Sequence, residues 1–176
     1  TFEARFDFPY LVHAPMEPLD CVVRLTPTSC EIWAGDQFQT IDQMNAANAL
    51  GLKPQQVKIN TVFAGGSFGR RANIASDYVV EGVQIAKATR GVAPIRLVWT
   101  REDDIRGGRY RPLTHHWLKA AADANGIPAA WQHRIVTQSI LAGTPFEPMM
   151  VKNGIDGTSV EGASNLPYAI PNFQVE

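Results

Sequence analysis

The stretch Phe63–Asn73, FAGGSFGRRAN, restricts the fold more than any other part of this chain. It follows a segment, Gln56–Phe63, whose apolar residues alternate as in a β-strand, and it precedes a segment with helical spacing, Asn73–Arg90. Glycine adopts backbone conformations that other residues avoid, and it lets another group approach the backbone closely. The sequence therefore predicts a tight strand-to-helix loop with accessible backbone amides.

The composition is that of a globular protein. Of the 176 residues 45% are apolar, which suffices for a buried core in one domain or in two small lobes. The formal net charge of −1 creates no overall field that attracts nucleic acid or an anionic membrane. No apolar run has the length of a membrane span. We therefore expect neither a nucleic-acid partner nor a transmembrane segment in these residues.

The remaining segments predict an α+β fold with mixed or antiparallel sheets and packed helices. The expected elements are a strand in Thr1–Tyr10, a hairpin of Cys21–Leu25 and Cys30–Ala34, a helix Gln37–Leu50 capped by Asp36 and ended by Gly51, a strand Ala93–Thr100, and a hairpin of His115–Ala122 and Ala129–Ser139 turning at Asn125–Gly126. The segments Arg101–Pro112 and Glu147–Glu176 are expected to be loops. Because the chain begins and stops without terminal signals, we expect a single fragment, 1–176, of a longer protein.

A metal held by protein side chains is not expected. Cys21 and Cys30 lie nine residues apart with no CxxC motif, and the four histidines have no ligand spacing. The two cysteines could form a disulfide, but two buried free thiols are the preferred interpretation.

The Phe63–Asn73 loop has two interpretations on residue chemistry alone. Glycine amides, a helix N-terminus and the Arg70–Arg71 pair could bind a phosphate or a similar anion. Alternatively, this is a tight turn with two solvated arginines. The segment RGGRYRP, Arg106–Pro112, could likewise present Arg109 to a carbonyl or carboxylate, or be a surface loop. For Arg101–Asp104 a salt-bridge cluster is preferred over a carboxylate site, and for His13 and Glu17 a polar anchor over a catalytic pair.

Several stretches together resemble the large molybdenum-binding subunit of the xanthine dehydrogenase/aldehyde oxidase family. The branch they resemble most includes the isoquinoline 1-oxidoreductase beta subunit and membrane-associated aldehyde dehydrogenases. The stretches occur in the family's order and cover nearly the whole chain: HAPMEPLDC (13–21), CEIWAGDQ (30–37), AGGSFGRR (64–71), DYVVEGVQIAKATRGVAPIRLVWTREDD (77–104), YRP (110–112) and EGASNLPYAIPNFQVE (161–176).

This resemblance implies a molybdopterin-binding lobe of a molybdenum hydroxylase, an oxidoreductase. In the family, molybdenum is held by the dithiolene of molybdopterin, often in the cytosine dinucleotide form. The enzyme oxidises an aldehyde or a carbon beside nitrogen with oxygen derived from water, and electrons leave through iron–sulfur clusters on another domain or a small subunit. The branch also implies export by a twin-arginine signal to a periplasmic or membrane-associated location, with a cytoplasmic location as the alternative.

The resemblance also implies which residues form the site. The cofactor would lie beside Gly65, Gly66, Ser67, Phe68, Gly69 and Arg70, and Arg109 matches an arginine that orients substrate in relatives. No catalytic residue is expected within the fragment, because the family's base glutamate lies beyond Glu176. Ser67 replaces a glycine, and Ala72 and Leu11 stand where relatives carry a glutamate and a glutamine. Two alternatives therefore stay open: a binding module that has lost the cofactor, and a nucleotide-phosphate site at Arg70–Arg71.

Overall fold

A computed structural model describes all residues, 1–176. The chain folds into two compact units. One unit comprises residues 12–109, and the other joins residues 1–11 to residues 110–176. The short strands β2 (Leu11–Val12) and β7 (Tyr110–Arg111) fall where the chain passes between the units. Each unit has a four-stranded sheet of its own, and helices accompany the sheets, so the predicted α+β class is confirmed.

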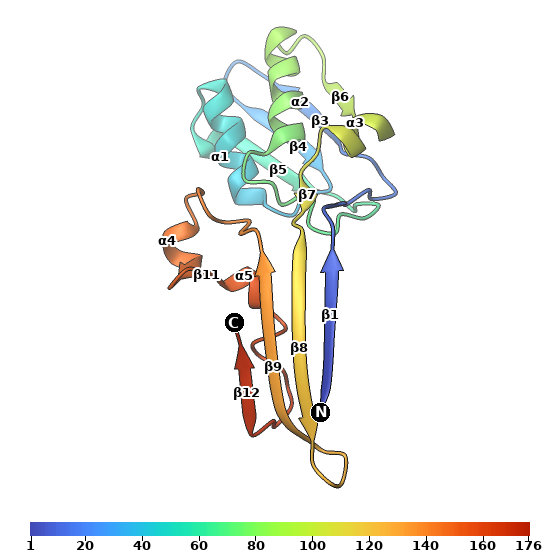
Figure 1. Cartoon of the computed structure of the whole chain (residues 1–176). Helices are drawn as coiled ribbons and strands as arrows, with labels where there is room; N and C mark the ends of the chain where they lie inside the picture. The colour runs from blue at the N-terminus through green and yellow to red at the C-terminus, as the bar shows by residue number, and fades with distance from the viewer. The chain divides into compact units, whose positions relative to one another are not determined.

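The sheet of the 12–109 unit has the strand order β5-β4-β3-β6 (Figure 1). Strands β3 and β4 form the predicted antiparallel hairpin, and β4 pairs in parallel with β5. A parallel pair needs a crossover connection, and the helix α1 supplies it. The strand bounds are β3 Asp20–Leu25, β4 Cys30–Ala34, β5 Val57–Thr61 and β6 Ile95–Val98.

Two helices, α1 (Gln39–Leu50) and α2 (Asp77–Ala88), pack on one face of this sheet (Figure 1). Alternate strand residues point toward them and are buried, as period-two alternation requires. A Cβ on Gly82 would lie 2.6 Å from the Cys21 sulfur, so this glycine lets α2 approach the sheet closely. The buried apolar core comprises Leu19, Cys21, Val23, Cys30, Ile32, Ala34, Ala46, Ala47, Val57, Tyr78, Val79, Val83 and Ala86.

Both helices begin later than the sequence predicted. Asp36 is not the N-cap of α1: its carboxylate accepts a hydrogen bond from the Phe38 N–H at 2.7 Å, in a turn before the helix. Ser76 has a φ of 51°, which is left-handed backbone that an α-helix cannot contain, so α2 begins after it. The predicted end of α1 is confirmed, since Gly51 adopts the left-handed conformation with φ of 72°.

The two cysteines are free thiols in the core, as preferred from the sequence. Burial raises the pKa of Cys21 to about 12 and the pKa of Cys30 to about 11. The thiolate, which is the reactive form, is therefore scarce at neutral pH, and we assign both residues to packing.

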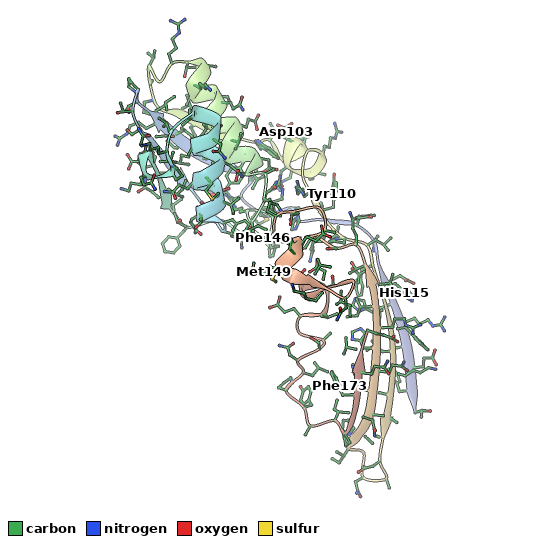
Figure 2. The ribbon with its side chains drawn as sticks, turned by 90° about the vertical axis from the view of Figure 1, so that its left-hand side faces the viewer. Asp103, Tyr110, His115, Phe146, Met149 and Phe173 are labelled. Atoms are coloured by element: carbon green, nitrogen blue, oxygen red, sulfur yellow. The ribbon has the colours of Figure 1, made fainter.

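The segment expected to be an acidic-basic loop begins with a short helix, α3 (Arg101–Arg106). Thr100 and Asp103, the latter labelled in Figure 2, form a reciprocal capping box, in which the N–H group of each residue donates to the side chain of the other. The loop prediction for these six residues was therefore wrong, because it weighed charge composition above the capping signal. The Arg101–Asp104 ion pair is present at 2.8 Å, with Asp104 buried.

The second unit contains a long sheet with the order β1-β8-β9-β12 (Figure 1). The predicted hairpin of β8 and β9 is confirmed, with Gly126 at its turn in left-handed backbone. The prediction that Glu147–Glu176 is a loop was wrong in part, because β12 pairs in parallel with β9. The bounds are β1 Phe2–Phe8, β8 Thr114–Ala122, β9 Pro128–Thr137, α4 Glu147–Met150, β10 Val151–Lys152, β11 Ile155–Asp156, α5 Gly157–Val160 and β12 Asn172–Val175.

The two faces of this long sheet differ in character. Phe2, Phe6 and Phe8 share one face, and all three remain exposed. The opposite face carries Trp117 among the cationic side chains of Arg5, Lys119 and Arg134. Figure 2 labels His115 and Phe173, whose positions in the register place them on opposite faces. Among the helices of both units, none has both the length and the apolar character needed to cross a membrane.

A buried carboxyl group, Asp42 on α1, lies in the interior of the 12–109 unit. Burial raises the pKa of Asp42 to about 8; the Ser76 hydroxyl opposes this increase, and the nearby Asp36 and Asp77 carboxylates add smaller contributions in the same direction as burial. Neither oxygen of the Asp42 carboxyl group has a hydrogen-bond partner at normal distance and angle. Asp42 is therefore largely protonated at neutral pH, which avoids placing a second negative charge beside Asp36.

This protonation predicts a pH-dependent difference between the protein and its Asp42→Asn variant. Asp42 holds its proton up to about pH 8 when folded, but its usual pKa is 3.8. Its contribution to stability is full below the unfolded pKa and declines as pH rises toward 8. Between the usual pKa of 3.8 and the folded pKa of about 8, we expect the free energy of unfolding of Asp42→Asn to rise relative to that of wild type as the pH increases. The expected slope is up to roughly 1.4 kcal/mol per pH unit.

Urea unfolding at several pH values between about 5 and 8 measures this difference in the free energy of unfolding. Glu102→Gln, at an exposed position on α3, is the matched control and should show a flat difference. A pH-independent difference between Asp42→Asn and wild type would contradict the assigned protonation.

Candidate functional site

The glycine-rich loop packs against the His13–Pro18 segment. Their backbones pair directly, because the Glu17 N–H donates to the Gly65 carbonyl at 3.2 Å and the Gly65 N–H donates to Glu17 Oε2 at 2.7 Å. A Cβ on Gly65 would lie 2.6 Å from the Glu17 Cβ, and one on Gly66 would lie 3.4 Å from the Pro15 Cβ. Position 65 therefore requires glycine, because Glu17 lies too close to the loop backbone for a side chain there.

Beyond Gly65 the loop presents free backbone donors. The N–H groups of the four residues Gly66–Gly69 donate to no protein group, whereas the N–H groups of Arg70, Arg71 and Ala72 bind back into the loop. Gly66 has a φ of 105° and Gly69 a φ of 99°. Successive backbone N–H groups without protein partners can bind an anion or an electron-rich oxygen.

Phe68 stands at the centre of this run. Its φ is 57°, a conformation that costs energy for an aromatic residue, and its side chain is 68% exposed. Backbone strain combined with an exposed ring is a feature of binding sites rather than of packing.

Ser67 directs its side chain into the protein. Its hydroxyl donates to Gln37 Oε1 and accepts a hydrogen bond from the Arg71 N–H at 3.0 Å. The serine that departs from the family pattern therefore binds the loop to the segment before α1 through its hydroxyl group.

Both arginines of the loop are buried and paired. Arg70 is 3% exposed and binds the Asp77 carboxylate with both terminal nitrogens, at 3.3 and 2.7 Å, while its guanidinium lies over the Trp99 ring. Arg71 is 0% exposed and binds Glu17 at 2.9 Å and Asp20 at 3.7 Å. Carboxylates of the same unit neutralise both guanidinium groups. Arg70 and Arg71 therefore do not form the phosphate-binding site that was considered from the sequence.

Arg109, the residue predicted to orient substrate, lies beside this loop through its backbone. The Arg109 carbonyl is 3.1 Å from His13 Nδ1, and His13 Nε2 would lie 3.9 Å from a Cβ on Gly69. A carbonyl only accepts, so Nδ1 carries the proton in this pair. A Cβ on Gly108 would lie 2.9 Å from the Asp104 carbonyl oxygen and 3.1 Å from the Arg70 Nε. The Arg109 side chain is exposed.

Sequence reasoning underestimated two residues of this site. Glu17 was interpreted as a polar anchor, yet its carboxylate holds both Gly65 and Arg71. Arg101 was assigned to a salt-bridge cluster, yet it also donates to the Pro15 and Met16 carbonyls at 2.6 and 2.9 Å. A signal was present for Glu17, since a segment with two prolines, Pro15 and Pro18, leaves backbone groups that must be satisfied by side chains.

The whole chain, residues 1–176, matches the family described as the molybdopterin cofactor-binding domain. Isoquinoline 1-oxidoreductase subunit beta of Brevundimonas diminuta is 31% identical over 144 residues, which cover 81% of this chain and 18% of that protein. The membrane-bound aldehyde dehydrogenase (pyrroloquinoline-quinone) of Gluconacetobacter polyoxogenes is 28% identical over 150 residues, with coverages of 84% and 18%. This chain therefore spans less than a fifth of these relatives.

Solved structures show the same fold. Aldehyde oxidoreductase from Desulfovibrio gigas superposes with a TM-score of 0.70 at 21% identity, covering 99% of this chain and 18% of that one. Quinoline 2-oxidoreductase from Pseudomonas putida 86 gives a TM-score of 0.69 at 18% identity, with coverages of 98% and 22%.

The close approach at Gly65 predicts a large effect of a single methyl group. We expect Gly65→Ala to lower the free energy of unfolding by about 1–3 kcal/mol, because the new Cβ overlaps Glu17 and no flexible side-chain end can move away. Gly157→Ala is the control, since the nearest atom to its Cβ would be 3.5 Å away and its φ is also not positive. Chemical unfolding of both variants tests this, and equal stabilities would contradict the packing described.

Proposed function

Because this chain belongs to the molybdopterin cofactor-binding domain family, we propose that it is the first cofactor-binding lobe of a longer molybdenum hydroxylase subunit. The enzyme would oxidise an aldehyde or a nitrogen heterocycle. The relatives named isoquinoline 1-oxidoreductase and aldehyde dehydrogenase support these two substrate classes.

One observation carries the proposal: the run of free N–H groups at Gly66–Gly69 with an exposed Phe68 ring in its middle. Molybdopterin is an oxygen-rich, anionic group with a planar ring system. Backbone N–H groups can donate to the oxygens of molybdopterin, so no charged side chain has to be buried beside the cofactor. The Phe68 ring can pack against an apolar edge of its ring system. The residues present therefore fit the group.

The site residues divide into two roles in this proposal. Gly66, Ser67, Phe68 and Gly69 contact the cofactor through their backbone N–H groups, with Ser67 contributing its N–H and not its hydroxyl. Gly65 and Arg70 act from behind the loop, because the Gly65 N–H is bound to Glu17 and Arg70 is buried against Asp77. When bound, the molybdenum centre would supply a two-electron oxidation with oxygen from water.

Arg109 is the substrate-orienting residue in this proposal. Its backbone is held beside the loop by His13, while its side chain is exposed. A guanidinium presents a rigid fork of donors to a carbonyl or carboxylate, and it stabilises negative charge that develops on substrate oxygen.

The remaining parts of the proposal concern groups outside this chain. We propose the cytosine dinucleotide form of the cofactor and a small iron–sulfur subunit as electron acceptor. We also propose a periplasmic or membrane-associated location, which the name of the membrane-bound aldehyde dehydrogenase relative supports. The alternative of a binding module that has lost the cofactor draws no support from the loop, since the N–H groups of Gly66–Gly69 donate to no protein group and the Ser67 hydroxyl binds Gln37.

Metal and nucleotide analysis of the intact subunit tests the cofactor proposal. The subunit, expressed with molybdate and a competent cofactor pathway, should contain molybdenum, and acid hydrolysis should release cytidine monophosphate. A protein that folds but contains no molybdenum under these conditions would refute the proposal. Another nucleotide in the hydrolysate would refute only the cytosine form.

Arg109 gives a second prediction, on kinetics. Arg109→Ala should lower kcat/KM by about 10²–10³-fold with unchanged molybdenum content, because a donor to developing charge is lost. Arg109→Lys should recover part of the activity. Arg106→Ala, an exposed arginine three residues earlier, is the control and should behave as wild type. Equal kinetics for Arg109→Ala and Arg106→Ala would remove Arg109 from the site.

A further inference from the structure

Arg71 and Glu17 form an ion pair that joins two irregular segments, the His13–Pro18 segment and the glycine-rich loop. Arg71 is completely buried, and its guanidinium is 2.9 Å from Glu17 Oε2. The Glu17 side chain is 38% exposed, so the pair is buried on the arginine side only, and its contribution to stability is small because desolvation of the arginine offsets the attraction. What such a pair does supply is a defined geometry between the groups it joins.

Glu17 and Arg71 fix the direction in which two peptide groups of the glycine-rich loop point. Glu17 Oε2 accepts from both the Gly65 N–H and Arg71, and the Glu17 N–H donates to the Gly65 carbonyl. The Arg71 Nε donates to the Gly66 carbonyl at 3.3 Å. Two successive carbonyls of the loop are thus bound, one by the Glu17 N–H and the other by the arginine that Glu17 neutralises.

All peptide bonds in the chain are trans, so each N–H points opposite to the carbonyl of its own peptide unit. Fixing the Gly65 carbonyl toward Glu17 directs the Gly66 N–H away from Glu17. Fixing the Gly66 carbonyl toward Arg71 directs the Ser67 N–H away from Arg71. The first two donors of the free N–H run are therefore oriented by contacts on the opposite side of the loop.

We propose that Glu17 is a positioning residue, which together with Arg71 orients the Gly66 and Ser67 N–H groups toward the bound cofactor. This rests on the proposed function, because it assigns those N–H groups to the cofactor. Glu17 itself does not contact the cofactor in this scheme: the one carboxylate oxygen with known partners is occupied by Gly65 and Arg71.

The variant Glu17→Gln tests the proposal in the intact subunit. It keeps the size of the side chain and removes the charge, which leaves Arg71 with Asp20 at 3.7 Å as its remaining anion. Hydrogen exchange of the peptide 65–72 reports on the loop, because the N–H groups of Arg70, Arg71 and Ala72 are its bonded amides. We expect protection in this peptide to fall at least tenfold and molybdenum content to fall by a similar factor.

The matched control is Glu31→Gln. Glu31 lies in the same unit and also forms ion pairs, with Arg24 and Lys58, but it lies on β4 and has no bond to the loop. Its exchange in peptide 65–72 and its molybdenum content should equal those of wild type. If Glu17→Gln matches Glu31→Gln in both measurements, the proposal is overturned.

A double variant, Glu17→Gln with Arg71→Met, separates positioning from charge balance. It removes the buried Arg71 charge together with its Glu17 partner and leaves only the partly exposed Asp20 without an arginine, so it should fold even if Glu17→Gln alone does not. We expect its unfolding midpoint to return toward wild type while protection of peptide 65–72 and molybdenum content stay low. Recovery of both measurements would show that the pair serves only to neutralise charge, and would overturn the proposal.

Failure of the cofactor proposal is distinguishable from failure of this one. If wild-type subunit contains no molybdenum, the proposed function fails, but the exchange measurement still decides whether Glu17 orders the loop. If wild type contains molybdenum and only the exchange of Glu17→Gln is unchanged, the proposed function stands and the positioning role fails.

Discussion

The placement of the Arg71 charge in the interior of the 12–109 unit is the constraint on which the site depends. A guanidinium cannot lose its proton in a protein, so burial must be balanced by carboxylates brought to it. Two carboxylates do this: Glu17, in the segment before β3, and Asp20, the first residue of β3. To reach Arg71, the His13–Pro18 segment has to lie directly on the glycine-rich loop, and this fixes where glycine is required.

From that contact the properties of the loop follow in order. Gly65 has no room for a Cβ, Gly66 and Gly69 adopt left-handed backbone, and the carbonyls turn toward the protein. The N–H groups on the other side of the same peptide units are left without partners. Ser67 fits this arrangement because its hydroxyl binds inward to Gln37 and the Arg71 N–H. The loop thus carries strain and unpaired donors that a bound, oxygen-rich cofactor would satisfy.

Local periodicity predicted the regular elements well. The β3–β4 and β8–β9 hairpins and the helix end at Gly51 were predicted because alternation and turn glycines are local signals. The strand β12 was missed because its partner β9 lies about forty residues away in the sequence, and a parallel pairing leaves no local pattern. The helix α3 was missed although its capping box, Thr100 and Asp103, is visible in the sequence.

The sequence by itself determined the α+β class, the position of the glycine-rich loop between a strand and a helix, and the family resemblance that six ordered stretches carry. Only the tertiary structure decided the roles of the charged residues. From sequence Arg70 and Arg71 could bind an external anion or be solvated, and Glu17 could be an anchor. The choice depends on which carboxylates lie within about 4 Å of each guanidinium, and it is folding that brings Glu17, Asp20 and Asp77 to these positions.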